Sequence, residues 1–240
     1  MQLLVCEQYE QLSRRAAVLV QAQLTLKPDS VVGFATGSTP LGLYRLLAQA
    51  QRRGEMDASG ITAVNLDEYY PLSPGHPQSY RTFMQHHVWR PLGLRPDKTH
   101  IPRGDAPDPQ RECRRYDELL RRLGPVDLQL LGLGRNGHIG FNEPGAKWVA
   151  GTHLTRLTAS TLRANARFFS PGEAAPRHAL TMGAGAIFSA RRILLLVTGA
   201  EKAAALRALL HGPITPQLPA SLLQLHPAVT ILADRAAAGA

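Results

Sequence analysis

A chain of 240 residues, 44% of them apolar, is long enough to bury a sizeable core and too apolar for a disordered protein. The formal charge of +9 is compatible with an anionic partner, but the arginines are scattered and form no nucleic-acid-binding motif. Two cysteines are too few for a disulfide framework or a cysteine-based zinc site, and no stretch reaches the roughly 18 apolar residues of a membrane helix.

Four apolar runs predict strands, at residues 30–36, 61–67, 126–134 and 192–199, and a fifth follows at 228–234. The first four are continuously apolar rather than alternating. This pattern is typical of strands in a parallel sheet that helices cover on both faces.

Helical patterns separate these strands, and the sequence contains no internal repeat or linker. Because strand and helix alternate, we predict an α/β fold in which residues 1–240 form one domain. Its sheet is expected to be doubly wound and mainly parallel, with helices on both faces. The predicted helices cover residues 7–26, 40–53, 79–89, 108–123, 180–189 and 199–211.

A polar cluster follows each of the first four strands. In chain order the clusters are "ATGSTP", "NLDEYY", "GLGRNGHIGFNEP" and "VTGAEK". In open parallel sheets, ligands bind outside the carboxyl ends of the strands. The four clusters are therefore expected to meet at one edge of the sheet, which makes that edge the predicted ligand site.

The first cluster predicts an anion site at the start of a helix. Free backbone N–H groups, the helix dipole and three hydroxyls can bind a phosphate together, and a glycine lets the backbone come close to it. Ser38 or Thr39 is expected to cap the helix, with Pro40 in its first turn. An ordinary capped helix start is the equally weighted alternative. The predicted substrate-binding residues are Thr36, Gly37, Ser38 and Thr39.

The second cluster places Asp67 and Glu68 at a strand end. Neighbouring side chains on a strand point in opposite directions, so one carboxylate can enter the cleft while the other faces elsewhere. A carboxylate in a cleft is a candidate general base. The alternative is a pair of surface acids beside a turn.

The third cluster combines His138 with Glu143 and Asn136 within a glycine-rich loop. One histidine and one glutamate make a poor metal site, and their spacing matches no zinc motif. We therefore favour a proton relay in which Glu143 orients the imidazole. A structural histidine is the alternative.

Two basic residues are candidates for the counter-charge of a bound phosphate. Lys202 follows the fourth strand, and Arg167 lies in "RANARFF". A phosphate that hydroxyls hold usually recruits a cation as well, although most such residues are simply solvated.

Together these stretches resemble the glucosamine-6-phosphate deaminase (isomerase) family, whose superfamily includes 6-phosphogluconolactonase. The resemblance covers nearly the whole chain and is most specific in "GLGRNGHIGFNEPG". It is carried further by "TGSTPLGLY", "NLDEYYPLSPGHPQSY", "ANARFF", "ALTMGAGAIFSARRILLLVTGAEKA" and "LQLHPAVTILAD".

The resemblance implies conversion of glucosamine 6-phosphate to fructose 6-phosphate and ammonium, without metal or organic cofactor. It implies that Asp67 is the base that removes the C2 proton. It also implies that His138, with Glu143 and Asn136, opens the sugar ring. Some members of the family carry Asp where this chain has Asn136.

The larger, allosteric members resemble each other in a Ser-Ser pair and an Arg-x-Lys motif. This chain has Ala146 and Lys147 at the first place, and His153 and Thr155 at the second. The resemblance therefore does not extend to activation by N-acetylglucosamine 6-phosphate.

Two other functions compete with the deaminase: a 6-phosphogluconolactonase, and a non-catalytic domain that senses a sugar phosphate. We expect a small-molecule substrate and no nucleic-acid or membrane partner, and a homo-oligomer stays open. The N-terminus lacks a basic segment followed by an apolar core, so we expect a cytoplasmic protein.

Overall fold

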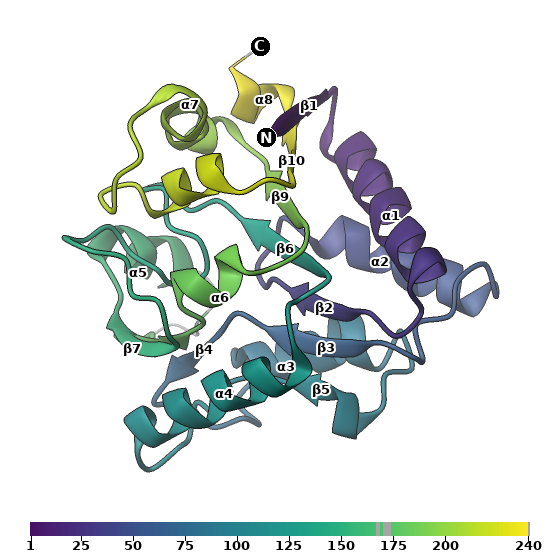
Figure 1. Cartoon of the computed structure of the whole chain (residues 1–240), viewed down its shortest axis with the longest axis horizontal. Helices are drawn as coiled ribbons and strands as arrows, with labels where there is room; N and C mark the ends of the chain where they lie inside the picture. The colour runs from purple at the N-terminus through teal and green to yellow at the C-terminus, as the bar shows by residue number, and fades with distance from the viewer. Residues whose placement is uncertain (167–168, 170–173, 240) are drawn as a thin grey trace.

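The computed structural model describes residues 1–239 except 167–168 and 170–173. The described residues form a seven-stranded parallel sheet at the centre of the molecule (Figure 1). All five predicted strands are present in it, and the mainly parallel α/β fold is confirmed. The spatial order is β1 (Gln2–Cys6), β10 (Val229–Asp234), β9 (Ile193–Val197), β6 (Leu128–Gly132), β2 (Val31–Phe34), β3 (Thr62–Asn65) and β5 (Thr99–His100).

Two strands of this sheet, β1 and β5, were not expected from the sequence. They lie at its two edges. β1 pairs with β10 and brings the two ends of the chain together, as Figure 1 shows. Neither edge strand is a long apolar run, because an edge strand is not enclosed like the central ones. β9, by contrast, is buried at all five positions.

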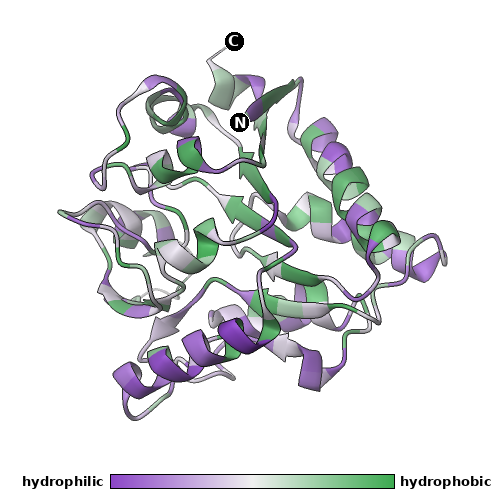
Figure 2. Cartoon of the chain, in the orientation of Figure 1, coloured by the Kyte–Doolittle hydropathy of each residue, from purple (hydrophilic) through white to green (hydrophobic). Residues whose placement is uncertain are grey.

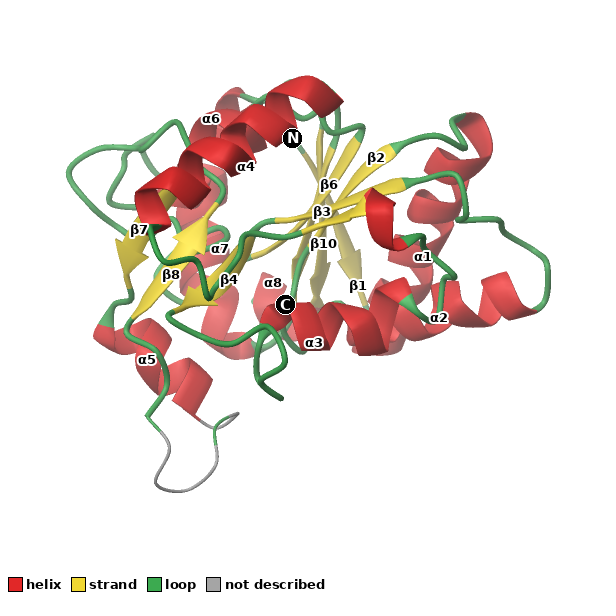
Figure 3. Ribbon diagram, turned by 90° about the horizontal axis from the view of Figure 1, so that it is seen from below, coloured by secondary structure: helices red, strands yellow, loops and turns green. Residues whose placement is uncertain are grey.

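Helices cover both faces of the sheet. Figure 3 shows α4 (Pro109–Leu123) and α6 (Ala184–Phe188) on one side and α1 (Tyr9–Leu26), α2 (Leu41–Arg52) and α3 (Tyr80–Met84) on the other. A short π-helix (Gln85–Trp89) continues α3. Near the chain's end lie α7 (Ala203–His211), α8 (Arg235–Ala238) and 3₁₀ turns at Ala200–Lys202 and Pro219–Leu225; another 3₁₀ turn, Pro96–Lys98, precedes β5.

α4 illustrates how the sequence specifies these helices. The side chain of Asp108 accepts hydrogen bonds from the first free backbone N–H groups, and Pro109 occupies the first turn. Cys113, Tyr116 and Leu120 form the buried stripe, while the arginines face solvent, as the polar outer surface of α4 in Figure 2 shows. The basic residues of this segment therefore belong to a solvated helix face.

A second, three-stranded antiparallel sheet corrects the sequence prediction. Its order is β4 (Asp67–Tyr70), β8 (His178–Thr181) and β7 (His153–Arg156). The predicted strand at 61–67 ends at Asn65, and a new strand starts at Asp67. The predicted helix at 180–189 was wrong over its first residues, because pairing with β4 and β7 draws them into β8, and α6 follows. α5 (Ala159–Ala166) was also not predicted.

The strand order places the site. The chain adds β3 and β5 on one side of β2, and then returns to add β6, β9 and β10 on the other side. The carboxyl ends of the adjacent strands β2 and β6 therefore border a topological switch point, where open α/β sheets bind their ligands.

Candidate active site

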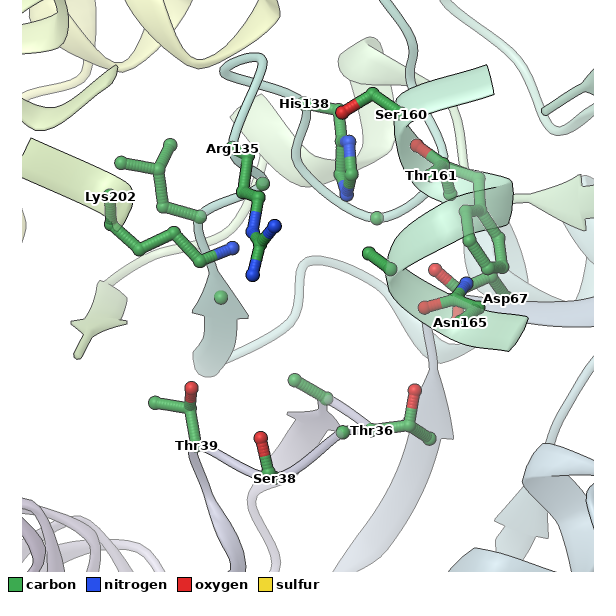
Figure 4. Close-up of a pocket in the computed structure, with 18 of the residues that line it drawn as sticks. Thr36, Ser38, Thr39, Asp67, Arg135, His138, Ser160, Thr161, Asn165 and Lys202 are labelled. Atoms are coloured by element: carbon green, nitrogen blue, oxygen red, sulfur yellow. The ribbon is translucent and has the colours of Figure 1, made fainter. Parts of the chain in front are cut away.

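A cavity of about 310 Å³ opens at this switch point. In Figure 4, Lys202 and Arg135 lie on one side of it and Asp67 on the other, with Ser38 below and His138 above. Loops after β2, β6 and β9, the start of β4, and α5 contribute to its wall. The predicted residues that line it are Thr36, Gly37, Ser38, Thr39, Asp67, His138 and Lys202.

The loop after β2 presents hydroxyls to the cavity rather than using them to cap α2. α2 begins at Leu41, and its first-turn N–H at Gly42 donates to the hydroxyl of Tyr9 on α1 (2.7 Å). The expectation that Ser38 or Thr39 caps the helix was therefore wrong, because Tyr9 satisfies that group. The hydroxyl of Thr39 instead lies 3.1 Å from that of Thr198.

The backbone conformation of the loop after β2 depends on Gly37. Its φ of +96° is a conformation that other residues rarely adopt, although a Cβ there would meet no atom within 4 Å. Glycine is therefore required by the backbone conformation and not by crowding. The same turn leaves open space in front of the loop.

Asp67 and Glu68 face opposite ways, as the strand pattern predicted. Glu68 accepts hydrogen bonds from the backbone N–H groups of Tyr69, Tyr80 and Arg81, each at 2.9 Å, and so anchors the first turn of α3. Burial raises the pKa of Glu68 to about 7 against the effect of these bonds. Asp67 lines the cavity although only 6% of it is exposed. Burial raises the pKa of Asp67 well above its usual range, and the nearby charge of Glu68 adds to this effect.

Asn136 connects His138 to Glu143. Its amide nitrogen donates to Glu143 Oε2 (2.8 Å), and its amide oxygen lies 2.7 Å from His138 Nδ1. Because an ionised carboxylate only accepts, the amide orientation is determined by Glu143. The amide oxygen also only accepts, so Nδ1 of a neutral His138 carries the proton. The other ring nitrogen, Nε2, is then left with its lone pair free to take a proton.

The loop after β6 fits closely around this imidazole. A Cβ at Gly134 would lie only 2.3 Å from His138 Nδ1, so any larger residue there would displace the ring. Side-chain exposures of 19% for His138 and 6% for Glu143 show that the pair is largely withdrawn from solvent. His138 lines the cavity, whereas Asn136 and Glu143 stand behind it.

Glu143 is ionised at neutral pH despite its burial. Burial pushes its pKa upward, but the interaction with His138, together with hydrogen bonds from Thr161 and Asn136, lowers the pKa to about 2. The His138 Nδ1 to Glu143 Oε2 distance is 3.6 Å, so Asn136 joins the two side chains, and their charges attract each other directly once the imidazole is protonated.

Residues 7–232 match the family described as glucosamine-6-phosphate isomerases/6-phosphogluconolactonase. The chain belongs to this family. The glucosamine-6-phosphate deaminase of Halothermothrix orenii is 48% identical over 238 residues, which cover 99% of each chain. Glucosamine-6-phosphate deaminase 2 of Bacillus subtilis is 46% identical over 240 residues, covering 99% of this chain and 96% of that one.

Solved structures agree with this membership of the glucosamine-6-phosphate isomerase/6-phosphogluconolactonase family. The structure of a monomeric glucosamine-6-phosphate deaminase is 47% identical and has a TM-score of 0.96; the match covers 100% of this chain and 99% of that chain. A 6-phosphogluconolactonase from Trypanosoma brucei shares the fold at 19% identity, with a TM-score of 0.79 and coverage of 99% and 97%.

Several residues that line the cavity were not assigned from the sequence. Arg135 projects into the cavity beside Lys202, and its guanidinium lies 4.0 Å from Glu201 Oε1. Tyr80 lines the cavity from α3. α5 contributes Ser160, Thr161, Arg163, Ala164 and Asn165. The motifs of the resemblance contain Arg135 and Tyr80, and "ANARFF" contains Ala164 and Asn165, but the sequence did not predict that residues 159–166 form a helix.

The predicted cation Arg167 lies outside the described residues. Among the described residues, no group of three or more His, Cys, Asp or Glu side chains is arranged to hold a metal ion. No helix in the described part of the chain has the length and apolar character needed to cross a membrane.

Proposed function

We propose that this chain converts glucosamine 6-phosphate to fructose 6-phosphate and ammonium. One observation carries the proposal: the cavity sets a buried carboxylate, Asp67, across from an imidazole that has a defined tautomer, beside a loop suited to phosphate. The high identity to deaminases along the full chain supports the same reaction.

Phosphate binding is assigned to the residues from Thr36 to Thr39 together with Lys202. Backbone N–H groups and hydroxyls can donate to the phosphate oxygens, while the ammonium group of Lys202 balances their charge. Arg167, on the family pattern, is proposed as a further cation. Binding at this end of the cavity directs the sugar toward Asp67 and His138.

Ring opening is assigned to His138. The sugar is held as a closed hemiacetal, so a proton must leave the anomeric hydroxyl and another must reach the ring oxygen. Nε2 accepts the first proton, and the imidazolium that forms is stabilised by the negative charge of Glu143. The protonated ring then supplies the proton for the ring oxygen, which leaves an open-chain aldehyde.

Isomerisation is assigned to Asp67. Its carboxylate removes the proton from C2, and the electrons of that bond form the C1–C2 double bond of an enolamine. The electrons of the C1 carbonyl move to its oxygen, and a proton of the substrate's ammonium group ends on that oxygen. Asp67 then returns its proton to C1, and the nitrogen lone pair forms the C=N bond of a ketimine at C2. Burial strengthens the basicity of the carboxylate, because its pKa is raised. Water adds to the C2 imine, and the C–N bond breaks to release ammonia, which leaves as ammonium.

Lactone hydrolysis is the nearest alternative, because the family includes 6-phosphogluconolactonases, but the lactonase structure from Trypanosoma brucei is only 19% identical to this chain. Hydrolysis of 6-phosphogluconolactone needs a base for water but none at C2. A buried carboxylate at the position of Asp67 is the feature that favours the deaminase. A sensor domain would need the phosphate loop but neither Asp67 nor the relay of His138.

The substrate carries a phosphate, which keeps such sugars inside the cell, so we propose a cytoplasmic enzyme. A relative that is 47% identical has been solved as a monomeric glucosamine-6-phosphate deaminase. One chain is therefore proposed to suffice for the reaction, whether or not copies assemble into a homo-oligomer. The test is to incubate the purified chain with glucosamine 6-phosphate and to quantify both products. Equal amounts of ammonium and fructose 6-phosphate are expected, and absence of both would overturn the proposal.

A further inference from the structure

The carboxylate of Glu143 contacts more than the histidine relay. Its Oε1 accepts hydrogen bonds from the hydroxyl of Thr161 (2.5 Å) and the backbone N–H of Thr158 (3.3 Å). Its Oε2 accepts from the hydroxyl of Thr158 (3.2 Å) as well as from Asn136. The carboxylate is therefore shared between the relay and a pair of threonines 15 and 18 residues further along the chain: the threonines bind Oε1, while Thr158 and Asn136 both bind Oε2.

These threonines form the start of α5. The carbonyl of Thr158 accepts from the N–H of Leu162 (2.9 Å), and its hydroxyl accepts from the N–H of Thr161 (3.3 Å). Thr158 thus stands where a helix cap stands, and the negative charge of Glu143 lies at the positive end of the helix. α5 in turn supplies one wall of the cavity.

We propose that Thr158 and Thr161 are positioning residues for ring opening: their hydroxyls hold the Glu143 carboxylate in the orientation in which it binds Asn136, and Asn136 in turn orients His138. This inference rests on the proposed function. Neither threonine is assigned any contact with the reacting atoms; each acts through Glu143. The same hydrogen bonds hold the start of α5 against Glu143, so a change in the orientation of Glu143 is expected to disturb both His138 and this wall of the cavity.

Charge and burial explain why the threonines are needed. Only 6% of the Glu143 side chain is exposed, so its lone pairs have little access to water and require protein donors. With Thr161 removed as a donor, Oε1 loses its shortest bond, and the carboxylate is free to rotate away from Asn136. The amide of Asn136 would then no longer be held with its oxygen toward Nδ1, and the tautomer of His138 would lose its support.

The test compares Thr161→Val, which keeps the shape and removes the donor, with Thr161→Ser, which keeps the donor. Thr155→Val, on β7 outside the network, is the matched control. With glucosamine 6-phosphate, Thr161→Val should lower kcat by roughly tenfold to a hundredfold, as expected for loss of a hydrogen bond to a charged group. KM should change much less. Thr161→Ser should restore most of kcat, and the control should match the wild type.

A substrate analogue that cannot close its ring separates positioning from a general structural effect. Thr161→Val should turn over such an analogue nearly as fast as the wild-type chain does. An equal loss on closed and open substrates would overturn the proposal, as would a Thr161→Ser variant as slow as Thr161→Val.

Hydrogen exchange gives a readout that does not depend on activity. In Thr161→Val and in Glu143→Gln, the N–H groups of Thr158 and Leu162 should exchange faster than in the wild type, while those of β9 stay unchanged. Unchanged exchange at both would overturn the coupling of α5 to Glu143. If the wild-type chain released no ammonium, the proposed function would fail, but this exchange result would still stand.

Discussion

Replacing Asp67 by Asn tests two things at once: whether Asp67 is the base, and how much its burial as a charged group lowers the stability of the fold. The amide keeps the shape of the carboxylate but cannot accept a proton. Deamination should therefore fall by roughly 10²–10⁴-fold, the usual contribution of a general base. Substrate binding should hardly change, because the phosphate loop and Lys202 are untouched. Asp105→Asn, at an exposed carboxyl group, is the control and should leave activity unchanged.

The same substitution should stabilise the protein at neutral pH. Burial raises the pKa of Asp67 in the folded state above its unfolded value of 3.8, and the charge of Glu68 contributes. The folded chain then binds more protons than the unfolded chain between those two pKa values. The free energy of unfolding therefore falls as pH rises through this window. Asp67→Asn removes this loss, so its gain in Tm should be larger at pH 7 than at pH 4.

Thermal unfolding at the two pH values measures this effect. Each 1 kcal/mol gained should raise Tm by about 2–4 °C in a chain of this size. Exchange of the C2 proton with tritiated water is the matching assay for the chemistry, and it should vanish in the variant. Persistent exchange would show that another residue is the base. A lower Tm at pH 7 than the wild type would contradict the reading of Asp67 as a buried charge.

Three further predictions concern the relay and the phosphate. His138→Gln should lower kcat strongly with the closed sugar and much less with an open-chain analogue; equal losses would exclude ring opening as its role. Lys202→Ala should raise KM for glucosamine 6-phosphate, because the lost charge-assisted hydrogen bond contributes about 1.5–3 kcal/mol to binding. Unphosphorylated glucosamine should be a very poor substrate of the wild-type chain, and equal turnover of both sugars would contradict the phosphate site. Arg135→Gln should weaken inhibition by inorganic phosphate, because its guanidinium faces the cavity and its ion pair within the described part of the chain is a partly exposed one with Glu201. Unchanged inhibition would remove Arg135 from the site.

The sequence predicted the five inner strands of the central sheet because they are largely buried, whereas the two edge strands are not. A run such as Ile193–Val197 has few other structures available to it. The rule that ligands bind at the carboxyl ends of strands then brought Asp67, His138 and Lys202 to one edge, and all three line the cavity. These predictions depend on local pattern and on one general property of the fold.

The second sheet and α5 depend on contacts between distant segments, which no local pattern encodes. Leu180 and Thr181 were predicted as the first residues of a helix, yet pairing with β4 and β7 makes His178–Thr181 a strand. The hydroxyl of Thr161 finds Glu143 only after the intervening chain has folded back. Tyr9 was missed as the partner of α2 for the same reason, since it lies 33 residues before Gly42.

The central claim is that this chain deaminates an amino-sugar phosphate by proton transfer from its own residues. The most direct measurement offers the purified chain glucosamine 6-phosphate and 6-phosphogluconolactone in parallel, with a metal chelator present throughout. We predict rapid ammonium release from the first substrate and no hydrolysis of the second above the uncatalysed rate. Hydrolysis of the lactone with no release of ammonium would contradict the account.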